Sequence, residues 1–393
     1  MNKRSNASHS QWSDLPIDLL DKIAGCLETQ SDLGRFRSVC RGWRRSAPAP
    51  SHLKASRVLR LPWLPICDEF DEPDYFGLKE FTVYSIEPLP SSTHNDDTPS
   101  AAATRPWIVM LRFTKPGTAH LRDLADLSRV RKVDEGLPKV LDLRDYQVRE
   151  ICTTYRLCIR ENYRDPCAFS GEYFDFECFR ETEGGFMGLV LEYGGGLYAW
   201  KMGGKEWTEI SVTLEEDFHS YIVGYHKGKF FVVSKTGWTL TVDPISLETK
   251  EVAHEMQQHR VLLHRYLVGS SEDLFLVERE YVDDEVSCGY EFSVSKLDEH
   301  KGVWVLEEGE LKDHVLFIAY NNWSALVPAK HLPGYLRNCV YFADYDLSGC
   351  CDHPSSYFQV AEIRGGLQEG WQLCPRTKCS KLFWPPPTWL KKS

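Results

Sequence analysis

The feature that most constrains this chain is a pair of short apolar segments joined by a glycine turn, which recurs along the sequence. In "GFMGLVLEYGGGLYAWKMGGKEWTEI", residues 185–210, one apolar segment ends near Tyr193, a second runs from Leu197 to Met202, and a short third one lies at Trp207. Glycine permits the positive φ that tight hairpin turns require. These segments are therefore predicted to be antiparallel strands.

Two similar hairpins follow, in "GWTLTVDPISLETKEV" and "GYEFSVSKLDEHKGVWVL". If Tyr198, Leu240 and Phe292 are equivalent positions, the hairpins repeat after 42 and 52 residues. Propeller blades repeat with a period of about 40–50 residues. The pattern from residue 61 onward thus predicts an all-β domain, with a β-propeller as the leading architecture and a β-sandwich of the same strands as the alternative.

Composition limits the classes of function. The chain has 393 residues, 42% of them hydrophobic, which is enough for two or more folded domains. Its formal charge of −11 argues against a nucleic-acid partner, and it has no apolar stretch long enough to cross a membrane. Thirteen cysteines without a secretory signal indicate free thiols in a reducing compartment. We expect a location in the nucleus, the cytoplasm or both.

The stretch "LPIDLLDKIAGCL", residues 15–27, predicts a helix with Pro16 in its first turn. Its apolar residues cover two adjoining faces instead of one stripe, so the helix must be buried from more than one side. These residues are Ile17, Leu19, Leu20, Ile23, Ala24 and Leu27.

A second helix is predicted within "SDLGRFRSVCRGWRRSAP", residues 31–48. Its apolar positions recur every three or four residues and form one face that can pack on the first helix. Below about 40 residues, a chain usually needs a metal, a disulfide or a partner to be stable, and this helical hairpin has roughly 35. The sequence has no metal-ligand spacing within this segment, so we expect a partner protein to stabilise it.

At these residues the chain resembles the F-box family, whose pattern of Leu-Pro, paired leucines, an isoleucine and a Val-Cys-basic-x-Trp ending is present here. The resemblance implies docking onto the Skp-type linker of an SCF-type cullin–RING ubiquitin ligase. Ala24 departs from the pattern, because family members usually carry a larger aliphatic residue there. The residues expected to contact the linker are Leu15, Pro16, Ile17, Leu19, Leu20, Ile23, Leu27, Leu33, Val39, Cys40 and Trp43.

The C-terminal third is similar to plant F-box proteins that carry a KIB-type, kelch-like β-propeller, a domain of unknown function. Two stretches carry this similarity: Leu332, Pro333, Gly334, Tyr335, Asn338, Val340, Tyr341 and Phe342, and the closing Pro387 and Trp389. The order Gly194, Gly195, Tyr198 and Trp207 is also similar to a degenerate kelch blade.

We therefore predict a multidomain chain: a flexible tail at 1–11, an all-α F-box hairpin at 12–48, a linker at 49–60, and a propeller-like domain at 61–393 with a flexible insertion at 91–105. The resemblance implies a substrate-recognition adaptor that presents an unidentified protein for ubiquitination and degradation. A non-degradative interaction protein remains an alternative, as does a propeller enzyme or small-ligand sensor in which Trp238 and Trp323 line a central pocket.

Catalytic and metal-binding motifs are scarce. His254 and His259 are five residues apart, whereas a helical zinc protease needs its two histidines at i and i+4. A second cluster has only part of the spacing that zinc sites favour: Cys350, Cys351, His353, Cys374 and Cys379. We expect a non-catalytic subunit with no cofactor and no metal.

Overall fold

The structure is a computed structural model. It describes residues 15–25, 36–37, 39–46, 59–62, 75–88, 106–115, 118–122, 146–159, 174–192, 196–212, 221–256, 264–283, 288–306, 311, 313–318, 323–343, 358–363 and 366–367. The predicted tail at 1–11, the insertion at 91–105 and the closing Pro387 and Trp389 lie outside the described residues.

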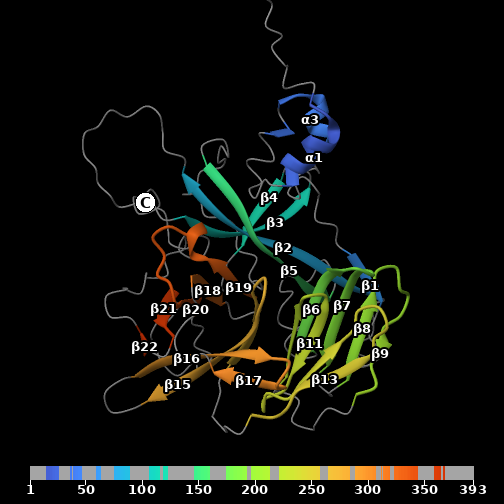
Figure 1. The fold of residues 1–393 in the computed structure, drawn as a ribbon. Helices are drawn as coiled ribbons and strands as arrows, with labels where there is room; N and C mark the ends of the chain where they lie inside the picture. Colours follow the sequence, from blue (N-terminus) through green and yellow to red (C-terminus); the bar gives the residue numbers. More distant parts are fainter. Residues whose placement is uncertain are drawn as a thin grey trace, which may run out of the picture.

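The strands form five sheets arranged around a common centre (Figure 1). Three of them are four-stranded antiparallel meanders in simple chain order. Blade 2 comprises β6 (Phe174–Thr182), β7 (Gly185–Glu192), β8 (Leu197–Lys201) and β9 (Thr208–Glu209). Blade 3 comprises β10 (Ile222–His226), β11 (Lys229–Val233), β12 (Thr239–Val242) and β13 (Thr249–Ala253). Blade 4 comprises β14 (His264–Gly269), β15 (Leu274–Asp283), β16 (Cys288–Asp298) and β17 (Val303–Leu306).

The three positions that defined the sequence repeat occupy the same place in these blades. Tyr198 lies in β8, Leu240 in β12 and Phe292 in β16, and each of these is the third strand of its blade. Glycines support the turns between strands where positive φ is needed, as at Gly203 (φ 85°) and Gly228 (φ 82°). The periodicity of the sequence therefore reported a real structural repeat.

Blade 1 has a different topology. Its strands are β1 (Leu59–Pro62), β2 (Tyr75–Pro88), β3 (Trp107–Lys115), β4 (Thr118–Arg122) and β5 (Tyr146–Ile159). The long strand β2 pairs along its length with β5, while its other edge is shared by β1 at one end and β3 at the other. Strand β1 begins at Leu59, so it already includes the last two residues of the predicted linker at 49–60.

Blade 5 closes the ring with a mixed sheet. Its strands are β18 (His314–Ile318), β19 (Ser324–Pro328), β20 (Cys339–Ala343), β21 (Phe358–Glu362) and β22 (Gly366–Leu367). Strand β18 pairs antiparallel with β19 but parallel with β20. The parallel pairing requires a crossover, and the 3₁₀ turn Ala329–His331 with the following residues supplies it.

A closed ring of apolar clusters holds the blades together. Clusters of buried side chains join blade 1 to blade 2, 2 to 3, 3 to 4, 4 to 5, and 5 back to 1. The closing cluster joins Phe81 and Ile108 of blade 1 to Val315 and Phe317 of blade 5. Five sheets that each pack on two neighbours form a β-propeller, which confirms the leading prediction over the β-sandwich.

Tryptophan and tyrosine side chains add hydrogen bonds between blades. The indole of Trp207 donates to the Pro62 carbonyl at 2.8 Å, and that of Trp304 donates to the Gly237 carbonyl at 3.0 Å. The Tyr335 hydroxyl donates to the Pro106 carbonyl at 2.8 Å, across the closing contact between blades 5 and 1. Each pairs a polar group that burial would otherwise leave unsatisfied.

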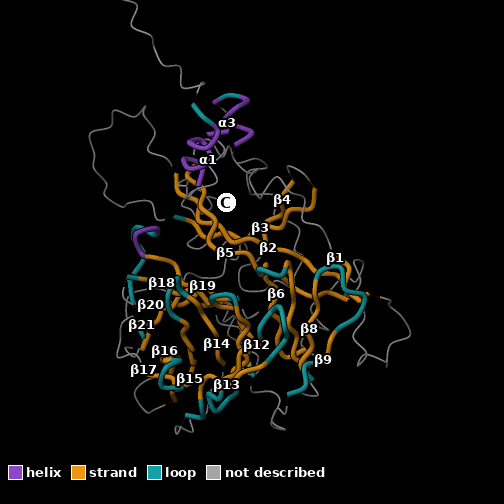
Figure 2. Tube along the Cα trace, turned by 45° about the vertical axis from the view of Figure 1, so that its right-hand side comes forward, coloured by secondary structure: helices purple, strands orange, loops and turns teal. Residues whose placement is uncertain are grey.

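Two helices lie outside the ring, beyond the β3–β5 end of blade 1, in both views (Figures 1 and 2). They are α1 (Ile17–Gly25) and α3 (Arg41–Ser46). Among the described helices, none is long and apolar enough to span a membrane.

Candidate functional site

The N-terminal helical hairpin has a small core of its own. Leu20, Ala24 and Phe36 are buried, and Leu15 and Trp43 pack against them. The rings of Phe36 and Trp43 lie 4.5 Å apart between centroids and tilted, a distance at which aromatic pairs attract. Ala24, the position that departs from the F-box pattern, therefore affects packing inside the hairpin and not its outer surface.

Four large apolar side chains of the hairpin are exposed. Ile17 is 58% exposed, Leu19 46%, Ile23 37% and Val39 54%. We call these four residues the apolar face. A helix that is apolar on two sides and packed on one leaves the other available to a partner. The structure thus separates the two adjacent leucines, since Leu20 points into the hairpin and Leu19 points out.

The other residues expected at the linker contact divide between these two environments. Pro16 is exposed and lies directly before α1, where its carbonyl accepts hydrogen bonds from the amides of Leu19 and Leu20. The helix thus begins one residue later than the sequence predicted. Cys40 is half-buried. Leu27 and Leu33 lie outside the described residues.

The second predicted helix is interrupted. Phe36, Arg37 and Val39 are helical, Cys40 is not, and α3 starts at Arg41. The expectation of one continuous helix is therefore wrong at Cys40. Two hydrogen bonds tie the segments together, because the Arg37 guanidinium donates to the Arg44 carbonyl at 2.9 Å and Arg44 donates to the Arg37 carbonyl at 3.2 Å. The apolar spacing of three and four residues continues across the break, which is why periodicity did not reveal it.

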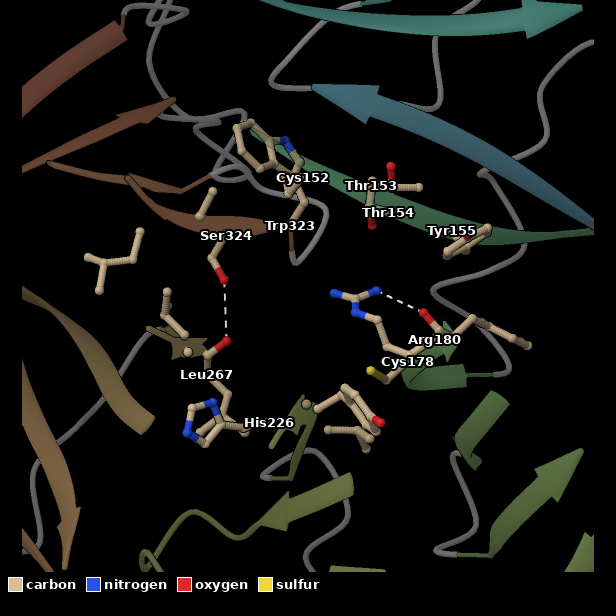
Figure 3. A pocket seen from close by; sticks show the side chains of 18 of the residues that line it. Cys152, Thr153, Thr154, Tyr155, Cys178, Arg180, His226, Leu267, Trp323 and Ser324 are labelled. Atoms are coloured by element: carbon tan, nitrogen blue, oxygen red, sulfur yellow. Dashed lines mark hydrogen bonds between the residues drawn. The ribbon is translucent and has the colours of Figure 1, made fainter. Parts of the chain in front are cut away.

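The propeller contains a cavity of about 320 Å³ on its axis. It is lined by residues of β5, β6, β10, β14 and β19, one strand from each of the five blades (Figure 3). Trp323, which the sequence suggested for such a pocket, does line it. Trp238 does not, because it packs against the apolar cluster between blades 2 and 3.

Four titratable side chains of this cavity are held in their neutral forms: Cys152, Tyr155, Tyr225 and His226. Burial raises the pKa of the Cys152 thiol to about 12. Burial also raises the pKa of Tyr155 and of Tyr225. Burial, followed by the nearby Lys227 charge, lowers the pKa of His226 below its ordinary value. At neutral pH these groups are therefore hydrogen-bonding partners without charge.

Close packing between neighbouring blades shapes the cavity wall. A Cβ added to Gly224 would lie 2.5 Å from the Leu267 side chain, and one added to Gly269 would lie 2.8 Å from Nδ1 of His226. Both distances are shorter than real Cβ contacts, so any other residue at these two positions would force the Leu267 or the His226 side chain to shift. Because these two residues have no side chain, Leu267 of β14 can pack directly on Gly224 of β10, and the His226 ring can pack directly on Gly269.

The metal and catalytic patterns in the sequence find no counterpart among the described residues, where no group of three or more metal-ligating side chains occurs. His254 is exposed, and its Nδ1 lies within hydrogen-bond distance of the Glu251 carboxylate, at 2.7 Å. His259 and the cluster around Cys350 lie outside the described residues. Cys40, Cys152, Cys178 and Cys339 are free thiols.

A helical hairpin with an unpartnered apolar face, joined to a five-bladed propeller with an axial cavity, defines an F-box protein of the propeller class. The family model described as KIB1-4 beta-propeller matches residues 75–363, and the F-box domain model matches residues 12–51. The chain belongs to the KIB1-4 beta-propeller family and carries an N-terminal F-box domain. Both resemblances drawn from the sequence are thereby confirmed.

Relatives in Arabidopsis thaliana match over most of their length. F-box protein At2g17036 is 27% identical over 97% of this chain and 95% of its own. F-box protein SKIP23 is 26% identical over 96% of this chain and 95% of its own. F-box/kelch-repeat protein At1g64840 is 25% identical over 85% of this chain and 84% of its own. The similarity to these plant proteins therefore extends over most of the chain.

The cavity residues other than Trp323 were missed by the sequence interpretation. A signal for them is present in the sequence repeat. The repeat marks the third strand of blades 2, 3 and 4, and the first strand of each of these blades is the innermost one, which lines the cavity. That rule leads to β6, β10 and β14, which carry Arg180, His226 and Gly269. It fails for blades 1 and 5, whose innermost strands β5 and β19 come at other points in the chain order.

Proposed function

We propose that this chain is the substrate-recognition subunit of an SCF-type cullin–RING ubiquitin ligase. The hairpin docks on a Skp-type linker, through which the cullin and RING subunits are reached, and the propeller binds a substrate protein for ubiquitination. The observation that carries the proposal is the apolar face. The large apolar side chains of Ile17, Leu19, Ile23 and Val39 are exposed in the described part of the chain, on an element that the family model identifies as an F-box.

In this proposal the chain contributes to ubiquitin transfer only by positioning the substrate protein. A scaffold that holds an acceptor lysine near a charged conjugating enzyme raises the effective concentration of the two groups, and needs no catalytic side chain of its own. The buried residues of the hairpin core have a supporting role, because they fix the helices that present the apolar face. The proposed location is the nucleus, the cytoplasm or both, where free thiols persist.

The docking step is tested by pull-down of the full chain with a purified Skp-type linker. Replacing Leu19→Ala together with Ile23→Ala removes exposed apolar area without touching the hairpin core, and we expect at least a tenfold loss of affinity, about 1.4 kcal/mol. Lys22→Ala on the same helix is the matched control, since Lys22 is exposed and polar. Equal binding of the double variant and the wild type would contradict docking through this face.

Degradation is a separate step from docking. Proximity labelling with the intact chain and with a variant lacking the F-box identifies proteins that the propeller holds. Proteins that accumulate only with the variant lacking the F-box support the proposal that the intact chain directs its substrates to degradation. Proteins that are held equally by both, with unchanged lifetimes, would instead support a non-degradative interaction protein.

A further inference from the structure

The axial cavity has a charge that contrasts with the rest of the chain. The sequence holds 57 acidic and 46 basic residues, yet no aspartate or glutamate is among the described residues that line the cavity. Its charged lining residues are Arg180 and Lys227. Four carboxylates outside the lining, those of Glu80, Glu150, Glu181 and Glu183, are near enough to raise the pKa of Tyr155 or Tyr225. One of them, Glu150, accepts a hydrogen bond from the lining residue Thr153 at 3.1 Å. The charged side chains that line the cavity are therefore cationic, although the protein as a whole is acidic and carboxylates lie behind the cavity wall.

Arg180 is the cationic side chain that extends into the cavity. It lies on β6, and Figure 3 shows its guanidinium extended into the cavity, between the β5 side chains and His226. The guanidinium donates one hydrogen bond, from an Nη atom to the Phe179 carbonyl at 2.8 Å. Within the described part of the chain it makes no ion pair with a carboxylate. An arginine has five N–H donors, so most of them remain available to a ligand.

Lys227, in contrast, already has a hydrogen-bond partner. Its ammonium donates to the Glu272 carbonyl across the gap between blades 3 and 4. Lys227 is exposed and sits at positive φ in the β10–β11 turn. We therefore assign it to the rim of the cavity, and Arg180 to its interior.

Neutral hydrogen-bonding groups line the same cavity as the guanidinium. Tyr155 and Tyr225 both line the cavity, and the Arg180 charge is near enough to both phenols to oppose the rise in pKa that burial produces. Both phenols remain protonated at neutral pH and can donate. Thr154 lies on the β5 wall (Figure 3). A planar cation among protonated hydroxyls is a typical environment for an oxyanion.

We propose that the axial cavity binds a small organic anion, whose carboxylate or phosphate group is held by the Arg180 guanidinium and whose body occupies the space between β5 and β10. The volume of about 320 Å³ is at the lower end of the roughly 300–1,000 Å³ typical of ligand pockets. It suits a small metabolite. Trp323 and the apolar residues of β19 and β10 supply the less polar part of the wall. This site is independent of docking on the linker.

The experiment uses the purified full chain in a buffer free of phosphate and carboxylates. Benzoate and inorganic phosphate serve as anionic probes, and benzamide is the neutral isostere of benzoate. Binding is followed by calorimetry and by saturation-transfer NMR. We expect at least one of the two anions to bind, and benzamide to bind at least tenfold more weakly than benzoate, because a neutral amide cannot form the charge-assisted pair with Arg180.

Two variants of Arg180 test its role. Arg180→Gln removes the charge and should weaken binding of the anion at least tenfold. Arg180→Lys keeps a point charge without the bidentate geometry and should give an intermediate loss. Arg337→Gln is the matched control, because Arg337 is exposed and paired with the exposed Asp313 at the surface. We expect it to bind the anion as the wild type does.

The outcome is separable from the proposed function. Arg180→Gln should retain wild-type binding to the Skp-type linker, which also shows that the variant is folded. The anion site is overturned if neither benzoate nor phosphate binds the wild type, or if Arg180→Gln binds them as tightly as the wild type does.

Discussion

The hairpin and the propeller expose the same number of large apolar side chains among the described residues, but with a different distribution. The hairpin exposes Ile17, Leu19, Ile23 and Val39 within two short helical segments. The propeller exposes Met202, Ile245, Val303 and Val305, on loops and edge strands of three blades. Scattered apolar residues are ordinary on a protein surface, whereas a cluster on a small element indicates an interface.

The two regions also differ in how they reach stability. Each blade of the propeller packs on two neighbours, so the ring has five continuous apolar contacts and covers its own core. The described core of the hairpin contains three buried residues, Leu20, Ala24 and Phe36. A core of this size gives little stability by itself. The comparison teaches that the propeller is self-sufficient, while the hairpin keeps part of its apolar surface for a partner.

The largest effect is expected at the contact that closes the ring. Phe317 is fully buried between blades 5 and 1 and packs against the rings of Tyr335 and Tyr341. Phe317→Ala should lower the free energy of unfolding by about 3–5 kcal/mol, because it removes a buried ring and leaves a cavity. Urea unfolding measures this. Val305→Ala, at an exposed position, should change it by less than about 0.5 kcal/mol. Equal effects of the two would show that the ring is not held by this cluster.

A smaller effect is expected in the hairpin, where two adjacent leucines can be compared. Leu20 is 2% exposed and Leu19 46%. Leu20→Ala should destabilise the hairpin by about 2 kcal/mol or more, because the side chain is in its core. Hydrogen exchange of the α1 amides in the full chain measures the loss. Leu19→Ala should leave exchange nearly unchanged and weaken linker binding instead. Faster exchange in both variants would mean that α1 does not have two distinct faces.

The smallest effect concerns pH and the propeller alone. The pKa of His226 is lowered from 6.5 by burial and by Lys227. The unfolded chain therefore takes up a proton at His226 more readily than the folded chain. Stability from neutral His226 is present above pH 6.5 and is lost as the pH falls through the lower, folded pKa. Urea unfolding on either side of pH 6.5, without added anions, should show less stability at the acidic value.

The variant His226→Gln should show a smaller fall in stability over the same pH range, since glutamine does not titrate. His254→Gln is the control, because the His254 side chain is exposed on the surface, where it contacts Glu251, and does not line the cavity. It should follow the wild type. A fall that is the same in His226→Gln and in the wild type would assign the pH dependence to other groups.

Much of the fold was predictable because the signals are local. The three regular blades follow the hairpin rule that a glycine turn joins two apolar strands, so Tyr198, Leu240 and Phe292 were aligned correctly from sequence alone. Blades 1 and 5 were not seen as repeats. In blade 1 the innermost strand, β5, is the last of the five strands of that blade in sequence order. In blade 5, strands β18 and β20 pair in parallel. Neither arrangement has a short-range pattern.

The sequence by itself determined the F-box pattern, the apolar character of α1 on two faces, and the presence of repeated antiparallel hairpins. These depend on neighbours three or four residues apart in a helix, or on a single turn in a hairpin. The tertiary structure decided which leucine points inward, that there are five blades, and that Arg180, Tyr155 and Tyr225 meet in one cavity. The physical reason is ring closure, because the packing of blade 5 on blade 1 brings five distant strands to a common axis.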